Sequence, residues 1–389
     1  MENFEAAKSR DLTYIMHTYG RSDICLVAGQ GSEVTDSEGK RYIDFTSGIG
    51  VNSLGFCDPD WVEAVAGQAG KLQHISNLYY TLPDGELAET LCTRTGYARV
   101  FFGNSGAEAN EAAIKLARKY SFDKYGAGRD KIVTLVNSFH GRTVTTLAAT
   151  GQEVFHNFFF PFTGGFAYVP AGDLEALKAA CGEDTCGVML EFIQGEGGVV
   201  PLDQDYVKAV AAFCKEKDIL LIADEVQTGI GRTGTLLASE QFGVQPDLTT
   251  LAKGLGGGLP IGACLCTEAL ADVMGPSSHG STFGGNPVCC AGANVVLKKM
   301  DEGFLAEVRE KGEWMRKEIS AAGYNVTGLG MMVGILPKKG TSAEIRTKAE
   351  AAGLLVLTAK ERVRLLPPLN ISWEDLKEGV KILLKTLDA

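Results

Sequence analysis

The hydrophobic pattern of the chain alternates between two periods. Short runs such as Ile219–Ala223 are apolar at every position, whereas segments such as 205–217 carry apolar residues at helical spacing. A fully apolar run suits a strand buried on both faces of a parallel sheet, and its alternation with helices is typical of βαβ units. We therefore expect a large α/β domain with a mostly parallel sheet over residues 51–290. Its predicted strands are 98–102, 131–136, 187–192, 219–223, 248–252 and 261–267, and its predicted helices are 59–75, one from about 83, 107–125 and 205–217.

The pattern changes on both sides of this domain. After it, two helices and several strands predict a small α+β domain over residues 291–389, and a capping box at Ser372 predicts its last helix. Before it, a short helix is expected within the first 20 residues, and residues 31–48 alternate around a Ser-Glu-Gly turn, which predicts a β-hairpin. Since a hairpin is not stable alone, the segment 1–50 is expected to pack with the small domain. The predicted C-terminal strands are near 325–335, 354–357 and 362–366.

Polar residues follow four of the predicted strands where each strand ends. They are Ser105, Arg142, Glu196 and Asp224. Open α/β sheets bind their ligands at the carboxyl ends of the strands, so we expect these four side chains to share one site. Their concentration at one edge carries more weight than any single motif.

An acid of this set and a lysine farther along the chain point to one cofactor. Asp224 ends a buried strand, and Lys253 follows the next short apolar run. A lysine that forms a Schiff base and an acid that pairs with a protonated ring nitrogen are the parts of a pyridoxal phosphate (PLP) site. Two solvated loop charges are the alternative, and their placement alone does not decide between the two.

Each of the neighbouring loops could bind a cofactor or a substrate, or could have only a structural role. Gly103–Glu108 opens a helix, so its N–H groups could bind a phosphate, or Ser105 could be a plain N-cap. Phe139 could stack on a flat cofactor and Arg142 could bind a carboxylate in a bidentate manner, or they could be a core ring and a surface charge. For Arg364, in a putative strand, a structural role is the default.

Composition excludes several classes of function. The net charge of −11 argues against a nucleic-acid or anionic-membrane partner, and no apolar run approaches the ~18 residues of a membrane span. No secretion signal is evident at the N-terminus. The ten cysteines include no CxxC pair, so we predict reduced thiols in a cytoplasmic protein and no metal site.

Four ordered motifs resemble the class III PLP-dependent aminotransferases of fold type I. They are Asn104–Asn110, Phe139–Arg142, Asp224–Gly229 and Gly280–Pro287. The resemblance covers nearly the whole chain. It implies a PLP-dependent transferase of fold type I, with a mostly parallel seven-stranded sheet in the large domain, a small α+β domain, and a homodimer with shared active sites.

The resemblance also implies cofactor roles for matching positions. Lys253 would form the Schiff base, Asp224 would pair with the ring nitrogen, and Gln227 would contact the phenolic oxygen. Gly106 and Ala107 would hold the phosphate, with Thr282 reaching it from the other subunit. The full set implied for the cofactor is Ser105, Gly106, Ala107, Phe139, Asp224, Glu225, Val226, Gln227, Lys253 and Thr282.

The substrates implied are a small amino acid and a 2-oxo acid. Within the class, Ser76–Tyr80 and the compact length are most similar to members that use N2-acetylornithine and 2-oxoglutarate in arginine biosynthesis. Glu196 would neutralise Arg364 while the ω-amino donor is bound and release it when 2-oxoglutarate enters. Lys253, Asp224 and Glu196 form the implied catalytic set, and the implied substrate contacts are Arg142, Ser281, Glu196, Arg364 and Tyr79.

Three alternatives stay open at this point. The amino donor could be ornithine, succinylornithine, γ-aminobutyrate or a lysine derivative, because the motifs recognise the cofactor and carboxylates common to all of them. An intramolecular PLP enzyme, such as an aminomutase or racemase, is less favoured because it needs no switchable carboxylate site. A non-enzymatic protein on the same fold would not need Lys253 together with Asp224.

Overall fold

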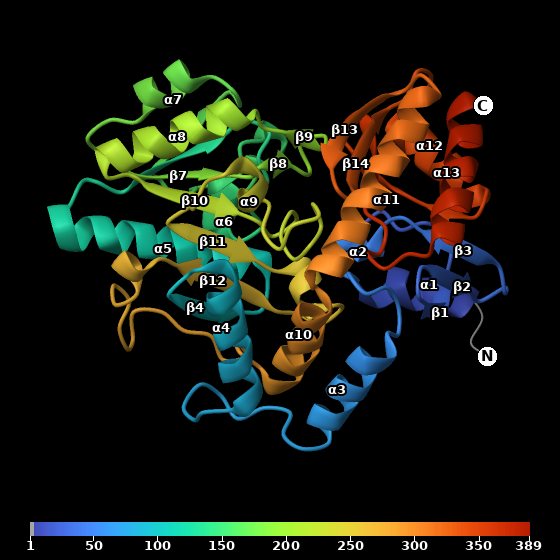
Figure 1. The fold of residues 1–389 in the computed structure, drawn as a ribbon, viewed down its shortest axis with the longest axis horizontal. Helices are drawn as coiled ribbons and strands as arrows, with labels where there is room; N and C mark the ends of the chain where they lie inside the picture. The colour runs from blue at the N-terminus through green and yellow to red at the C-terminus, as the bar shows by residue number, and fades with distance from the viewer. Residues whose placement is uncertain (1–3) are drawn as a thin grey trace.

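The computed structural model describes residues 4–389, so the first three residues of the predicted N-terminal segment lie outside it. A seven-stranded sheet with helices on both faces forms the larger part of the molecule (Figure 1). Its order is β4-β12-β11-β10-β7-β5-β6; β12 is antiparallel to both neighbours and the other pairs are parallel. The predicted mostly parallel, seven-stranded sheet is confirmed. Its strands are β4 (Arg99–Gly103), β5 (Lys131–Leu135), β6 (Phe166–Val169), β7 (Thr185–Leu190), β10 (Leu220–Asp224), β11 (Leu248–Leu251) and β12 (Gly262–Cys266).

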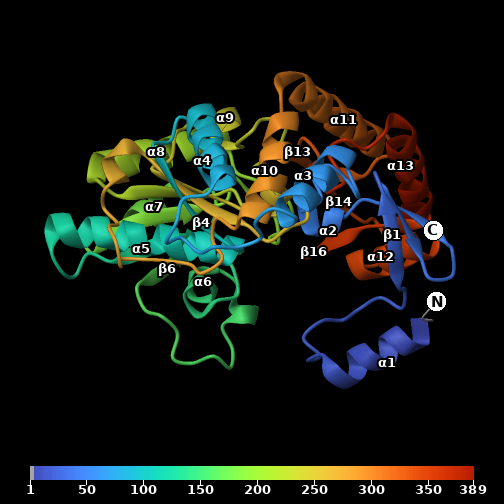
Figure 2. The same cartoon turned by 90° about the horizontal axis from the view of Figure 1, so that it is seen from below.

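Side chains of the central strands alternate between two helix-covered faces. On β10, Leu220 and Ile222 pack in the cluster that contains α5 (Gly106–Tyr125), whereas Leu221 and Ala223 pack in the cluster that contains α8 (Gln204–Lys217). Figure 2 shows α5 and α8 on opposite sides of the sheet. Because successive side chains of a strand point to opposite faces, this alternation decides which face of the sheet each polar residue at a strand end lies on. The other helices of this part are α2 (Ser47–Gly50), α3 (Pro59–Ala69), α4 (Leu82–Thr95), α6 (Val144–Ala149), α7 (Leu174–Ala180), α9 (Ser239–Phe242) and α10 (Pro287–Lys299).

The C-terminal part is the predicted small α+β domain. Its antiparallel sheet has the order β13-β14-β17-β16 and packs with three helices (Figure 1). The strands are β13 (Asn325–Leu329), β14 (Met332–Leu336), β16 (Leu357–Ala359) and β17 (Arg362–Leu365), and the helices are α11 (Glu302–Ala321), α12 (Ser342–Ala351) and α13 (Trp373–Asp388).

The N-terminal segment adds a second small sheet. The predicted hairpin is present as β2 (Glu33–Asp36) and β3 (Arg41–Asp44), with β1 (Leu26–Gln30) on its outer edge. β3 pairs in parallel with β15 (Leu354–Leu355), which joins this sheet to the C-terminal part of the chain. The boundaries at residues 50 and 290 stay a prediction. Helix α1 (Phe4–Tyr14) has no buried side chain.

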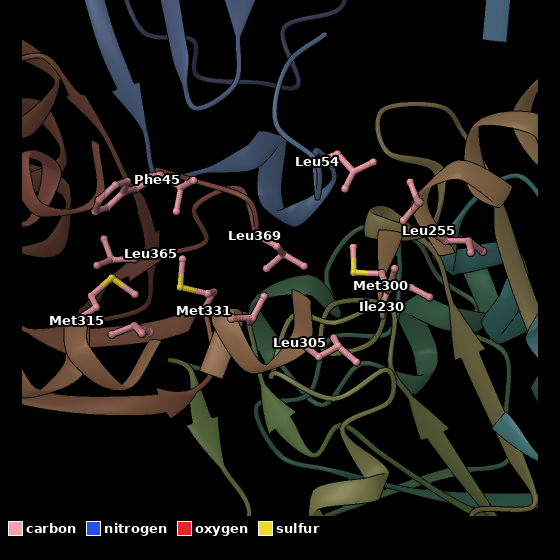
Figure 3. Close-up of a cluster of buried hydrophobic side chains, with 14 of the residues drawn as sticks. Phe45, Leu54, Ile230, Leu255, Met300, Leu305, Met315, Met331, Leu365 and Leu369 are labelled. Carbon is pink, nitrogen blue, oxygen red and sulfur yellow. The ribbon is translucent and has the colours of Figure 1, made fainter. Parts of the chain in front are cut away.

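One hydrophobic cluster continues across all these parts. Figure 3 shows Phe45 and Leu54 from the N-terminal region, Ile230 from the large sheet's loops, and Met315 and Leu365 from the small domain in the same cluster. A shared core of this kind fixes the small domain against the edge of the large sheet where β10 ends. Within residues 4–389, no helix is long and apolar enough to cross a membrane.

Gly312 provides a test of how tightly this core is packed. A Cβ placed on Gly312, inside α11, would lie 2.1 Å from the carbonyl oxygen of Gly330, and a backbone atom cannot move aside as a side chain can. We expect Gly312→Ala to lower the free energy of unfolding by about 1–3 kcal/mol, as overpacked sites do. Urea unfolding followed by circular dichroism measures this change.

The control is Gly303→Ala, near the start of the same helix. A Cβ there would approach only the side-chain oxygen of Asp301, at 3.3 Å, and Gly303 is exposed. Alanine favours a helix over glycine, so this variant should be neutral or slightly more stable. Equal urea midpoints for the two variants would contradict the packing described for α11.

Candidate active site

A cavity of about 480 Å³ lies where the parallel strands end. Loops that follow β4, β5, β7, β10 and β11 line it, as expected for an open α/β sheet. Ten of the predicted site residues line this cavity: Ser105, Gly106, Ala107, Phe139, Arg142, Glu196, Asp224, Val226, Gln227 and Lys253.

The Asp224 carboxylate is held from three directions. Its Oδ2 accepts hydrogen bonds from Asn110 Nδ2 and from His140 Nδ1, each at 2.8 Å, and its Oδ1 accepts from Val226 N at 3.0 Å. Asn110 is itself fixed, because Thr250 donates to its Oδ1 at 2.7 Å and its Nδ2 also donates to the His140 carbonyl. The carboxylate therefore faces the cavity in one orientation, between α5 and the loop after β5.

Glu225 lies on the opposite face of the sheet. Because side chains alternate along β10, the residue after Asp224 points toward α9, where its carboxylate accepts hydrogen bonds from Ala238 N at 2.5 Å and Ser239 N at 2.9 Å. Its side chain does not line the cavity. The structure thus does not bring the side chain of Glu225 to the other predicted cofactor residues.

The start of α5 offers an anion-binding surface. Ser105 caps the helix by accepting from Glu108 N, and the first backbone N–H groups of any helix have no partner within it. A Cβ on Gly106 would lie 2.6 Å from the Val226 side chain, so only glycine allows this approach. The helix start is therefore held against the loop that follows Asp224.

Lys253 reaches the cavity from the end of β11. Its backbone has a positive φ of 42°, a conformation that costs a residue other than glycine about 1–2 kcal/mol. Within residues 4–389 its amine makes no hydrogen bond or ion pair. Burial lowers the pKa of Lys253 from its ordinary value, and nearby Glu196 partly offsets this. A partly desolvated amine that a strained backbone presents to a cavity is a candidate nucleophile.

Two aromatic rings hold Arg142 at the mouth of the cavity. Its guanidinium carbon lies 4.3 Å from the centre of the Phe155 ring and 5.6 Å from that of Phe139, and the two rings meet edge to face. Among the described residues Arg142 has no carboxylate partner. Its charge is therefore available to an anionic ligand, while the rings restrict its orientation.

Glu196 and Arg364 form an ion pair across the two domains. Arg364, on β17 of the small domain, donates from Nη1 to Glu196 Oε1 at 2.5 Å and to Gln227 Oε1 at 3.2 Å. Burial alone would raise the pKa of Glu196, but the charge and hydrogen bond of Arg364 lower it below its ordinary value. The buried Nε of Arg364 has no partner among residues 4–389. Arg364 does not line the cavity itself, but it contacts two residues that do.

Glu191 is a cavity residue that the sequence reasoning missed. It follows β7 directly, is 5% exposed, and accepts hydrogen bonds from Phe139 N at 2.9 Å and Gly195 N at 3.1 Å. Burial raises the pKa of Glu191 to about 7. The alternation along β7 was the available signal, since Met189 packs on the α5 face and Glu191 follows it on that side.

Besides Glu225 and Arg364, three predicted residues do not line the cavity of this single chain. Tyr79 is 65% exposed, Thr282 is exposed, and Ser281 accepts a hydrogen bond from Asn104 Nδ2 at 3.0 Å without lining the cavity. Ser281 is nevertheless joined to the loop that starts α5. The structure leaves the assigned roles of these residues as predictions.

A second, larger opening carries no comparable chemistry. It is a cleft of about 870 Å³ between α3, α10 and α11, lined by charged side chains of both signs. Its Lys299 is paired with Asp58 and Asp60. Within the described part of the chain, no group of three or more metal-ligating side chains is found.

The residues of the cavity fit pyridoxal phosphate. The unpartnered Lys253 amine suits its aldehyde, and the carboxylate of Asp224 suits a protonated ring nitrogen. The start of α5 suits its phosphate, because a helix N-terminus attracts anions. The Phe139 ring lines the same cavity and provides a flat face.

Comparison with known sequences agrees with this chemistry. A family model described as "Aminotransferase class-III" matches residues 14–387 of the chain. The chain is 54% identical over 384 residues to an acetylornithine aminotransferase of Haemophilus ducreyi, with 98% of each chain covered. It is 50% identical over 378 residues to an acetylornithine aminotransferase of Caldanaerobacter subterraneus, covering 95% of this chain and 96% of the relative.

Solved structures show the same fold at lower identity. An N-acetylornithine aminotransferase from Stenotrophomonas maltophilia is similar with a TM-score of 0.84 and 39% identity, over 96% of this chain and 97% of that chain. An ornithine aminotransferase from Toxoplasma gondii is similar with a TM-score of 0.94 and 31% identity, over 100% and 95%. Similarity of fold alone therefore does not separate the two amino donors.

Proposed function

Because the chain belongs to the class III aminotransferases, we propose that it transfers the ω-amino group of N2-acetyl-L-ornithine to 2-oxoglutarate. The products are N-acetylglutamate 5-semialdehyde and glutamate, a step of arginine biosynthesis. The enzyme is a PLP-dependent transaminase. The observation that carries the substrate proposal is a pair of arginines suited to carboxylates: Arg142 lines the cavity without a carboxylate partner, and Arg364 is paired with Glu196, which lines the cavity. The two acetylornithine aminotransferases at 50% and 54% identity support the choice of donor.

The reaction requires a proton to leave the substrate carbon next to the amine. When bound, pyridoxal phosphate supplies a ring that takes up the resulting electron pair. Asp224, held by Asn110 and His140, would keep positive charge on the ring nitrogen. Lys253 would hold the cofactor. It would then take the proton from the substrate carbon as a base and give it to the cofactor as an acid, and its lowered pKa favours this task.

The other side chains would orient the cofactor. The phosphate would bind to the start of α5 at Gly106 and Ala107, next to the Ser105 cap. The ring of Phe139 would stack on the cofactor, and Gln227 would contact its phenolic oxygen. Val226 lines the cavity beside the phosphate site.

Two different substrates must use the same cavity in turn. With acetylornithine bound, Arg142 would hold its α-carboxylate while Glu196 neutralises Arg364. With 2-oxoglutarate bound, the Glu196 side chain would move away from Arg364. Arg364 would then bind the α-carboxylate, and Arg142 would bind the distal carboxylate. An intramolecular aminomutase has no need of such a switchable pair.

We propose a homodimer with shared active sites. Thr282 lies outside the cavity of its own chain and would reach the phosphate in the partner's cavity, and Tyr79 and Ser281 also lie outside the cavity of their own chain. Around them the chain exposes large apolar side chains, including Leu78 at 84% and Phe283 at 60%, which a second copy could cover. A cytoplasmic location is proposed as well, because all ten cysteines are unpaired thiols.

A comparison of amino donors tests the proposed reaction. We expect kcat/KM for N2-acetylornithine to exceed that for ornithine, succinylornithine and γ-aminobutyrate by more than about tenfold, with glutamate formed only when 2-oxoglutarate is supplied. Coupled detection of glutamate with each donor measures this. A tenfold advantage for ornithine or γ-aminobutyrate would reject acetylornithine as the donor, and product formed without 2-oxoglutarate would favour an aminomutase.

Substitution of Glu196 tests the switch. Glu196→Gln leaves the buried charge of Arg364 without its partner, so we expect kcat/KM of the donor half-reaction to fall about 10- to 100-fold. The 2-oxoglutarate half-reaction, in which Glu196 is displaced, should change less than about threefold. Single-turnover absorbance of the cofactor follows each half-reaction separately.

The matched control is Glu153→Gln. Glu153 is exposed and has no ion pair among residues 4–389, so the same change of carboxylate to amide should alter neither half-reaction. Equal losses in both half-reactions of Glu196→Gln would show that Glu196 does not distinguish the two substrates.

A further inference from the structure

Glu191 is a buried carboxylate in the cavity for which the proposed reaction has no use. Its Oε1 accepts from Phe139 N at 2.9 Å and its Oε2 from Gly195 N at 3.1 Å. The first bond reaches the loop after β5, residues 136–143, here called the Phe139 loop. The second reaches the loop after β8 (Ile193–Gln194), residues 195–199, here called the Glu196 loop. One side chain thus joins two loops that belong to different strands.

These two loops carry the parts that must act together. The Phe139 loop holds the ring and Arg142, and the Glu196 loop holds the carboxylate that pairs with Arg364. The loops also meet closely, since a Cβ on Gly197 would lie 2.7 Å from the carbonyl oxygen of Asn137. A Cβ on Gly195 would lie 2.6 Å from Oε1 of Gln227. The Glu196 loop therefore packs closely against both the Phe139 loop and Gln227, and next to it Gln194 Nε2 donates to the Val136 carbonyl at 2.9 Å.

We propose that Glu191 is a positioning residue that holds the Glu196 loop against the Phe139 loop, so that Glu196 stays in reach of Arg364 while the amino donor reacts. The proposal rests on the proposed function, because it concerns the switch between the two substrates. Glu191 acts through the loops and not on the substrate.

The chemistry of the two bonds requires a carboxylate. Both partners are backbone N–H donors, and a carboxylate offers one acceptor oxygen to each. A glutamine in the same place has one oxygen and one NH₂ group, so it can accept from one loop only and turns a donor toward the other. Such a change leaves a buried N–H unpaired, and the loop that loses its bond is free to shift.

A double-mutant cycle on the holoenzyme tests this role. Glu191→Gln, Glu196→Gln and the double variant are compared with the wild type in the donor half-reaction and in the 2-oxoglutarate half-reaction. If Glu191 acts by placing Glu196, then Glu196→Gln should lower kcat/KM of the donor half-reaction by a factor that is at least fivefold smaller in the Glu191→Gln background than in the wild type. Glu191→Gln alone should slow the donor half-reaction more than the 2-oxoglutarate half-reaction.

Asp44→Asn is the matched control. Asp44 is 1% exposed, and its carboxylate accepts from Thr46 N at 2.7 Å and Ser47 N at 3.0 Å, outside the cavity. This variant should lower the melting temperature but leave the fold-change caused by Glu196→Gln as it is in the wild type. If Glu191→Gln does not fold, Glu191→Asp, which keeps both acceptor oxygens on a shorter side chain, is used in the same cycle with the same expectation.

Two results would overturn the proposal. One is a double variant whose fold-decrease in kcat/KM of the donor half-reaction equals the product of the fold-decreases of the two single variants. The other is a Glu191 variant that resembles Asp44→Asn, with lower stability and an unchanged ratio of half-reactions. A failure of the proposed function is seen separately, because the wild type would then give no donor half-reaction with N2-acetylornithine.

Discussion

The fixed position of the Asp224 carboxylate is the constraint on which the rest of the site depends. Side chains alternate along β10, so Asp224 and Glu225 must face opposite sides of the sheet. The Asp224 carboxylate therefore accepts hydrogen bonds from Asn110 of α5 and from His140. The Glu225 carboxylate instead accepts hydrogen bonds from the backbone N–H groups of residues 238 and 239. Two consecutive acids at the end of β10 thus lie on opposite faces of the sheet, one in the cavity and the other in a structural role.

A second requirement is that charges from two domains meet at one cavity. Arg364 comes from the small domain and contacts Glu196, while Glu196 and Lys253 lie in loops of the large domain that line the cavity. The removal of one partner from a buried ion pair costs about 3–5 kcal/mol because it leaves a charge unpaired, so the buried Arg364 depends on Glu196. The continuous core around Phe45, Ile230 and Leu365 holds the domains in the arrangement that this contact needs.

Much of the site could be predicted because its residues lie in short motifs at strand ends. The strand-end rule brought Ser105, Arg142, Glu196 and Asp224 to one edge, and the structure places all four on one cavity. The resemblance to a family added Gln227 and the pairing of Glu196 with Arg364, neither of which the strand-end rule indicates.

The features that were missed depend on contacts between distant parts of the chain. The pairing of β3 with β15, and the ring of Phe155 under Arg142, leave no local pattern in the sequence. β6 was missed because it has only four residues, and α12 because Ile345 is its one large apolar side chain. The expected stretch near 325–335 is a hairpin, because Gly330 takes a positive φ of 52° and reverses the chain.

The proposed site is tested most directly by finding which lysine holds the cofactor. The holoenzyme is reduced with borohydride, which makes the bond between lysine and cofactor permanent, and the digest is analysed by mass spectrometry. We predict one modified peptide, with the pyridoxyl group on Lys253. A modification at another lysine, or none in protein that shows the visible absorbance of bound cofactor, would contradict it.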